Sequence, residues 1–328
     1  RGTTPTPYLA DGFLSHDEAE LLDVPLDSLL LDRLVPGEPV GIGTKWTIPA
    51  DVAAGLLAID TIESGGLDVE LTAVDDGLGT VRCAGILDGA VDGAPTHLSV
   101  EGEWSAAVAA ADGGWRVEPP RAVTVTIRER RQAGHVAPGL DVEARIRVAR
   151  RPAEAPPATA DTGGGPRRRG PGRPGAVWHR DRSGGFDLVH DARWRVVEDG
   201  AHGLVMRLVD HGALLAQCSL TALPRGDADA APTIAEVQRD VERSLGDQFG
   251  RFVHASESRR GDGVRIVRVV AEGTAESRSF RWIHHVVTDG HGRRAAAAFT
   301  LETRAGERFG AADREFVDGL AFPAHDPA

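Results

Sequence analysis

The chain has 328 residues, with 37 Lys and Arg against 49 Asp and Glu, and a formal net charge of −12. This length predicts two domains, each large enough to bury a core of its own. No apolar run approaches the roughly 20 residues that a membrane-spanning helix needs, which argues against an integral membrane segment. The acidic balance also argues against a general nucleic-acid binder, because such a protein needs a basic face.

Charge is distributed unevenly along the chain. Residues 1–151 contain 24 acidic and 13 basic side chains, residues 152–184 contain 3 and 6, and residues 185–328 contain 22 and 18. The middle segment is the only basic one, and Pro, Gly and Ala dominate it. It contains too few large apolar residues to anchor a core, so we predict a disordered linker over residues 152–183. The linker would separate a first domain, residues 1–151, from a second domain, residues 184–328.

The linker contains Gly172-Arg173-Pro174, which resembles the core of a minor-groove hook. Pro171 stands where such a hook needs its other arginine. A single imperfect hook in an acidic chain would bind DNA weakly, so we expect no nucleic-acid partner.

The first domain opens with helical signals. Ser15 and Glu18 form a capping-box pattern that predicts a short helix through Leu22. Leucines at helical spacing follow in residues 26–34, and Pro49 stands at the start of a third helical segment, residues 50–59.

From residue 67 the apolar period changes from 3.6 to 2. Five strands are predicted, at residues 67–74, 80–91, 96–109, 115–132 and 140–150. The turns between them are short and rich in Gly, Asp and Pro. We therefore predict a curved antiparallel meander with one buried and one solvated face, after a helical preface.

The second domain alternates between strand and helix patterns. Strands are predicted at residues 186–190, 194–199, 204–212, 214–224, 264–273, 279–289 and 293–303. Thr233 and Glu236 form a second capping box, and apolar residues at helical spacing continue from Ile234 to Phe249. A last amphipathic helix is predicted at residues 311–322. This order indicates an α+β domain in which helices cover an antiparallel sheet.

Residues 184–322 resemble the PsbP-like and Mog-like superfamily of α/β/α sandwich domains. The features that carry this resemblance are Trp194 in the opening strand, the helix at 233–249, and the paired strands at 279–303 followed by a helix. The resemblance implies a small α/β/α domain on an antiparallel sheet. In related proteins such a domain serves as an accessory or adaptor to larger assemblies, usually without catalysis.

The first half resembles the β-rich region of uncharacterised exported bacterial proteins. The matching element contains Pro36, Pro39, Val40, Gly43 and Trp46, and Thr44 stands where the usual aspartate would be. The resemblance implies a curved sheet of the lipoprotein-carrier type and an exported or periplasmic location. The sequence starts at Arg1 with no methionine and no apolar signal region, so we expect a mature or trimmed fragment whose targeting segment is missing.

Histidine is the residue type for which we consider a metal or catalytic site. His284 and His285 are neighbours in a predicted strand, so their rings point to opposite faces and cannot share one metal ion. Either His284 or, in preference, His285 could pair with His291 across the intervening turn, which makes His285 and His291 the metal candidates. A zinc site needs further ligands at suitable spacing, and no such motif occurs, so we expect no metal and no cofactor.

Nucleophilic catalysis has no sequence signature in this chain either. Cys83 and Cys218 lie in apolar strand-like runs without an adjacent base, which predicts buried cysteines that act as small apolar residues. We therefore assign no catalytic residue.

Two tryptophans are candidates for ligand binding. Trp104 and Trp115 flank a predicted turn in the first domain. Buried aromatic anchors are their ordinary role, and an aromatic wall that holds an apolar ligand inside the curved sheet is the alternative.

The resemblance of the second half, together with the lack of a catalytic motif, implies a non-enzymatic accessory or adaptor protein that binds protein partners through its second domain. The alternative is a carrier that holds a lipid or another hydrophobic ligand in the curved sheet of the first domain. A third hypothesis is an enzyme of unrecognised type, for which His284, His285 and His291 are the cluster to test.

Overall fold

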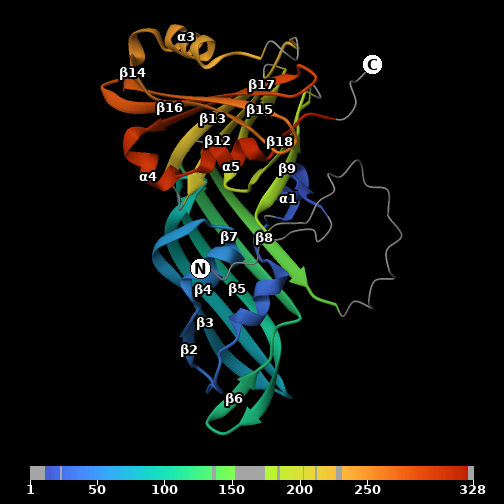
Figure 1. Ribbon diagram of the computed structural model, residues 1–328. Coiled ribbons are helices and arrows are strands. Elements are labelled where there is room, and N and C mark those ends of the chain that lie inside the picture. Colours follow the sequence, from blue (N-terminus) through green and yellow to red (C-terminus); the bar gives the residue numbers. More distant parts are fainter. Residues whose placement is uncertain are drawn as a thin grey trace. The chain divides into compact units, whose positions relative to one another are not determined.

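The computed structural model describes residues 12–22, 24–134, 138–151, 174–182, 185–201, 203–210, 213–226 and 231–323. The chain divides into two compact units. Unit 1 contains residues 17–167 together with 1–7, and unit 2 contains residues 168–328 together with 8–16. Figure 1 shows the elements of both units, and each is described below by itself.

Unit 1 is built on one antiparallel sheet with the strand order β2-β3-β4-β5-β7-β8. Its strands are β2 (Lys45–Thr47), β3 (Thr61–Asp75), β4 (Leu78–Val91), β5 (Ala94–Ala111), β7 (Ala122–Arg131) and β8 (Leu140–Ala149). Each strand from β3 to β8 pairs with the next long strand in the sequence, so the predicted antiparallel meander is confirmed.

Two-residue turns set the register of the first hairpins. Asp76-Gly77 joins β3 to β4, and Asp92-Gly93 joins β4 to β5. All four residues have positive φ, between 45° and 77°. Asp and Gly tolerate this backbone region, and turns of this kind match the twist of the flanking strands.

The predicted strand 115–132 is two strands in the structure. β6 (Gly114–Val117) pairs with β5, and β7 begins at Ala122. Pro119 and Pro120 lie between them, and proline cannot donate a hydrogen bond to a neighbouring strand. The strand is therefore interrupted, and the chain pairs with β5 a second time further along.

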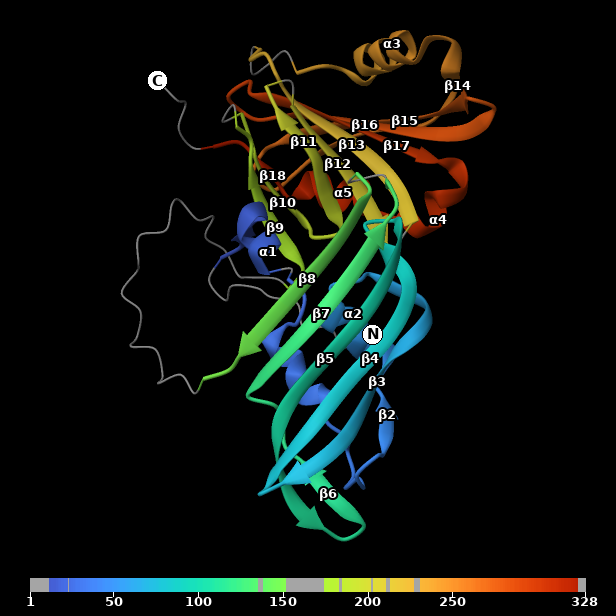
Figure 2. The same cartoon turned by 180° about the vertical axis from the view of Figure 1, so that it is seen from behind.

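The helices of unit 1 precede its long strands. They are α1 (His16–Leu22), the 3-10 helix η1 (Ser28–Leu34) and α2 (Ala50–Leu57). Buried leucines of η1 and α2 pack with one face of the sheet in a single apolar cluster, to which Leu31, Leu56, Val69, Leu71 and Leu87 contribute fully buried side chains. Figure 2 shows α2 against the sheet. The opposite face of the sheet, which we call the outer face, carries mostly polar side chains.

Unit 2 contains a seven-stranded antiparallel sheet with the order β11-β12-β13-β17-β16-β15-β14. The strands are β11 (Trp194–Gly200), β12 (Gly203–Asp210), β13 (Ala213–Leu223), β14 (Phe249–Arg259), β15 (Arg265–Ala275), β16 (Arg278–Thr288) and β17 (Arg294–Glu302).

Helices cover both faces of this sheet (Figure 1). On one face α3 (Ile234–Leu245) buries Val237 and Val241 against β15. On the other face lie α4 (Gly306–Phe309) and α5 (Ala312–Asp318), and Phe309 and Phe316 pack there around Phe299 of β17. The short 3-10 helices η2 (Gly246–Gln248) and η3 (Thr303–Ala305) connect these elements. The α+β fold class expected from the sequence is thus confirmed.

The helix α3 ends four residues before the predicted Phe249. Gly246 follows it with a φ of 52°, a left-handed conformation that favours glycine and stops the helix. Phe249 and Phe252 instead belong to the strand β14, which the sequence analysis did not assign, and pack against α3. They continue the apolar pattern of the helix in sequence, which explains the wrong prediction.

A small second sheet in unit 2 has the order β1-β9-β10-β18, formed by β1 (Leu14–Ser15), β9 (Ala176–Arg180), β10 (Asp187–Asp191) and β18 (Leu320–Ala321). Strand β9 corrects part of the linker predicted at 152–183, because residues 176–179 are buried in this sheet. Residues 152–173 lie outside the described residues, and the domain boundaries stay a prediction. Leu14 pairs in parallel with Val177, a contact that no local sequence pattern indicates.

None of the helices in the described ranges combines the length and the apolar character that a membrane span requires.

The capping box of α3 yields a stability prediction. The hydroxyl of Thr233 accepts from the amide of Glu236, whose carboxylate accepts from the amide of Thr233 at 2.8 Å. Replacing Thr233→Ala leaves helix amides without this partner and is expected to lower the free energy of unfolding by about 1 kcal/mol. Urea unfolding measures this loss. Thr233→Ser keeps the hydroxyl and should restore most of the stability; equal losses for both variants would contradict the capping role.

Candidate functional site

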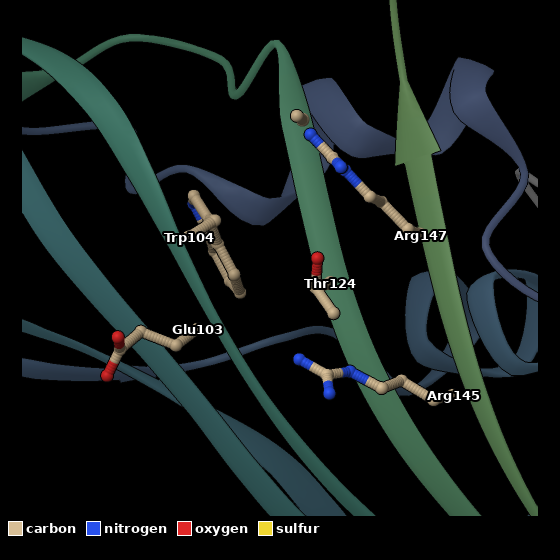
Figure 3. Close-up of a pocket in the computed structure, with 6 residues that line it drawn as sticks. Glu103, Trp104, Thr124, Arg145 and Arg147 are labelled. Atoms are coloured by element: carbon tan, nitrogen blue, oxygen red, sulfur yellow. The ribbon is translucent and has the colours of Figure 1, made fainter.

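A groove opens on the outer face of the unit 1 sheet. It has a volume of about 450 Å³ and is lined by residues of three neighbouring strands: Glu103 and Trp104 of β5, Ala122 and Thr124 of β7, and Arg145 and Arg147 of β8. We call it the β5–β8 groove (Figure 3). Trp104 is one of the two residues that the sequence proposed for ligand binding.

The strand register explains why these side chains meet. Glu103 lies opposite Thr124, and Thr124 lies opposite Arg147 on the next strand. Arg145 lies opposite Thr126. Residues that face each other across antiparallel strands point to the same side of the sheet, so the two arginines and the threonines share the outer face.

The two arginines differ from their neighbours in β8. Glu143 is held by Arg128 at 2.7 Å and Asp141 by Arg130 at 3.2 Å, both across the β7–β8 pair. Arg145 and Arg147 form no ion pair with any residue in the described part of the chain. Figure 3 shows both guanidinium groups extending from β8 over β7, whereas the carboxylate of Glu103 points away from them.

This arrangement suits an anionic group. A guanidinium presents several N–H donors in one plane and binds carboxylates or phosphates with paired hydrogen bonds. The hydroxyl of Thr124 lies between the two arginines and can donate a further hydrogen bond. The two arginines are therefore suited to carboxylate-bearing or phosphate-bearing partners.

The two candidate tryptophans have different surroundings. Trp104 is 5% exposed and belongs to the apolar core of unit 1 while it borders the groove. Trp115 is half-buried against the same core, and its backbone exchanges hydrogen bonds with Val40. Trp115 is not among the residues that line the groove. A ligand-binding role of either tryptophan stays a prediction.

A second cluster of polar side chains is buried in unit 2. The carboxylate of Asp313 in α5 lies 2.9 Å from Nε2 of His285 in β16 and accepts from Nε of Arg268 in β15 at 2.7 Å. Asp313 and His285 are 1% and 2% exposed. Arg268 and His285 are paired across neighbouring strands, so the register places both under the helix.

The charge states of this cluster follow from its burial. Burial lowers the pKa of His285, and this effect exceeds the opposing effect of the hydrogen bond to Asp313. Burial tends to raise the pKa of Asp313, but the hydrogen bonds from His285 and Arg268 outweigh it and the pKa is lowered. A neutral His285 thus donates its Nε2 proton to an ionised Asp313, which also balances the charge of Arg268.

The structure separates the other histidine candidates. His284 points to the opposite face of β16 from His285, and its Nε2 has no hydrogen-bond partner in the described ranges. His291 lies in the turn after β16, where its amide donates to Asp289 and its carbonyl accepts from Arg225. His285 is hydrogen-bonded to Asp313 through Nε2, and its predicted pairing with His291 stays a prediction. No group of three or more metal-ligating side chains occurs among the described residues.

Both cysteines are buried and free, as the sequence predicted. Burial raises the pKa of Cys83 to about 12 and that of Cys218 well above its ordinary value. Neither thiol is thus ionised at neutral pH.

The sequence matches no protein-family model and no curated protein. Among solved structures, the cyanobacterial PsbP protein of Synechocystis sp. PCC 6803 is 13% identical, with a TM-score of 0.37 over 51% of this chain and 99% of its own. LpqN of Mycobacterium tuberculosis, described as involved in cell envelope biogenesis, is 12% identical, with a TM-score of 0.31 over 42% and 83%.

A protein of Bacteroides thetaiotaomicron is 13% identical with a TM-score of 0.32. The match covers 45% of this chain and 48% of that one, so the chain spans about half the length of that protein. At scores below 0.5 these matches identify no family. The Mog-like resemblance of the second half and the exported-protein resemblance of the first half stay predictions.

The buried cluster predicts a large effect of a small substitution. Asp313→Asn removes the charge that balances Arg268 without changing the size of the side chain, and is expected to lower the free energy of unfolding by about 3–5 kcal/mol. Chemical unfolding measures the change. Asp318→Asn, an exposed position in the same helix, is the control and should stay within about 0.5 kcal/mol of wild type.

The buried histidines predict a loss of stability in acid. Burial lowers the pKa of His190 and of His284 to about 4, whereas the unfolded chain binds these protons near the ordinary value of about 6.5. The contribution of these two histidines to the free energy of unfolding is complete above the ordinary pKa and decreases as the pH falls toward 4. The free energy of unfolding should fall by about 1.4 kcal/mol per pH unit for each histidine within this window.

Urea unfolding at several pH values between 7.5 and 4.5 measures this slope. His284→Leu should make the slope shallower, and His254→Gln at an exposed position should leave it unchanged. A slope that is the same in all three proteins would contradict the burial argument.

Proposed function

We propose that this protein is a non-enzymatic accessory protein that acts by binding protein partners at the edge of the unit 1 sheet. The binding surface consists of strand β8 and the β5–β8 groove beside it. The observation that carries the proposal is the pair Arg145 and Arg147, two guanidinium groups without an ion pair in the described residues, on the last strand of the sheet. This surface lies in unit 1, whereas the family resemblance implies partner binding through the second domain.

The backbone of β8 supports the same surface. Strand β8 pairs with β7 on one side and is the last strand of the sheet on the other. The amide of Arg150 donates to the carbonyl of Arg121, so even-numbered residues of β8 direct their backbone groups toward β7. The odd-numbered residues, which include Glu143, Arg145 and Arg147, therefore direct theirs outward, where an extended segment could add a strand.

Charge selects the kind of segment that would bind. A strand that is added beside β8 places every second side chain on the outer face, next to Arg145 and Arg147. Carboxylates at those positions would complete two charge-assisted pairs, whereas basic side chains would be repelled. The proposed partner is an extended protein segment with acidic residues at alternating positions.

The other two hypotheses receive less support. A lipid carrier would need space on the inner face of the curved sheet, but side chains of η1 and α2 pack there, and the groove on the outer face is lined by charged side chains such as Arg145 and Arg147. An enzyme built on His285 would need substrate access, and His285 and Asp313 are buried and hydrogen-bonded to each other. The exported location stays a prediction that rests on the sequence resemblance.

Binding of a model strand tests the proposal. A short fluorescent peptide with two Glu residues at alternating positions among Val and Thr can place both carboxylates beside Arg145 and Arg147. It should bind the wild-type protein, with an affinity that falls as salt rises. The double variant Arg145→Glu, Arg147→Glu should weaken binding about tenfold or more, because it replaces attraction by repulsion. Fluorescence anisotropy measures both affinities.

The matched control is a peptide with Lys in place of each Glu. It should bind the wild-type protein poorly and the double variant better. Equal binding of the two peptides, or an unchanged affinity in the double variant, would refute the proposal.

A further inference from the structure

We infer that the strand bound by β8 is the same strand of a second copy of this chain, so that two unit 1 sheets join edge to edge in a symmetric dimer. The inference rests on the proposed function, because it names the partner of the β8 edge. It follows from the charge pattern of β8, which reads Leu-Asp-Val-Glu-Ala-Arg-Ile-Arg-Val-Ala over residues 140–149. The acidic residues stand in the first half of the strand and the basic residues in the second half.

Antiparallel pairing of two such strands about a twofold axis at Ala144 makes the charges complementary. Glu143 of each copy then lies opposite Arg145 of the other, and Asp141 lies opposite Arg147. All of these side chains are on the outer face, as the β7–β8 register shows. Opposite charges that face each other across strands stabilise the pairing, and like charges destabilise it.

The backbone hydrogen-bond pattern permits this register, and charge distinguishes it from the adjacent registers. Odd-numbered residues direct their backbone groups outward, and an axis at Ala144 pairs odd-numbered with odd-numbered residues. The nearest other registers that also pair odd-numbered with odd-numbered residues place the axis at residue 143 or 145. They set Glu143 against Glu143 or Arg145 against Arg145, so charge selects the axis at Ala144.

The apolar face of β8 is complementary in the same register. Leu140 and Val142 are 37% and 44% exposed, although they stand on the side of the strand that faces the core. An axis at Ala144 places Val142 opposite Ile146 of the second copy, and Leu140 opposite Val148. Ile146 and Val148 already pack against the core of unit 1, so the pairing would extend that core across the interface.

The ion pairs between β7 and β8 within each copy are compatible with this pairing. They would form two rows of charged side chains that run across the strands of both copies. Glu143 accepts from Arg128 on one side, and Arg145 of the second copy would approach from the other. Asp141 would likewise lie between Arg130 and Arg147 of the second copy. Each carboxylate would then be flanked by two guanidinium groups, and signs alternate along both rows.

Charge reversal and rescue test the inference. Sedimentation velocity of the wild-type chain at micromolar concentrations should show a dimer that dissociates as salt rises. Arg145→Glu with Arg147→Glu should give a monomer. Adding Asp141→Arg and Glu143→Arg to that double variant restores complementarity and should restore the dimer. The added arginines at positions 141 and 143 would face Arg128 and Arg130 of the same chain, which could destabilise the fold. Thermal melts of both variants therefore check that each is folded.

A disulfide tests the register independently of charge. With an axis at Ala144, the two copies of this residue face each other in a non-hydrogen-bonded pair, where Cα atoms are about 4.5 Å apart and a disulfide fits. Ala144→Cys should therefore form a covalent dimer under mild oxidation. Val142→Cys is the matched control, because its neighbour across the axis is Ile146 and no covalent dimer is expected. The native Cys83 and Cys218 are buried.

A wild-type chain that is monomeric at every concentration, or a dimer that persists unchanged in the double variant, would overturn the inference. Binding of the acidic peptide by a monomeric chain would leave the proposed function standing with another partner. A wild-type dimer whose register is confirmed by the Ala144→Cys cross-link, together with no peptide binding at concentrations where the wild-type chain is monomeric, would support the inference and refute binding of other acidic segments. A monomer that binds neither peptide would refute both.

Discussion

Antiparallel pairing commits each side chain of a strand to one of two faces, and both units depend on this constraint. In unit 1 it directs Val125 and Ile127 into the core, and it directs Thr124 and Arg147 to the opposite face. In unit 2 it sends His284 and His285 to opposite sides of one strand. The chemistry of each site therefore follows from register, because a shift by one residue would exchange the two faces.

The two units use arginine in opposite ways. In unit 2 Arg268 is bonded to Asp313 beneath a helix, where the loss of either partner would leave a buried group without compensation. In unit 1 Arg145 and Arg147 are solvent-exposed and unpaired within the described residues, so they remain available to a partner. The buried cluster thus serves stability, and the exposed pair is suited to recognition.

The edge of a sheet is a position that proteins must either protect or use. Charged side chains on β8 discourage pairing with most other strands, since like charges would meet. In β8 the acidic residues come before the basic ones, so an antiparallel copy of the same strand places opposite charges face to face and can pair with it. One short sequence would thereby oppose unspecific aggregation and favour one specific partner.

Local patterns in the sequence determined the meander of unit 1, because alternation of period 2 and Asp-Gly turns act between neighbouring residues. They determined the capped start of α3 in the same way. The pairing of Leu14 with Val177, and of Asp313 with His285, depended on contacts between distant parts of the chain. Such contacts leave no spacing signal, because only the tertiary structure decides which buried groups share one site.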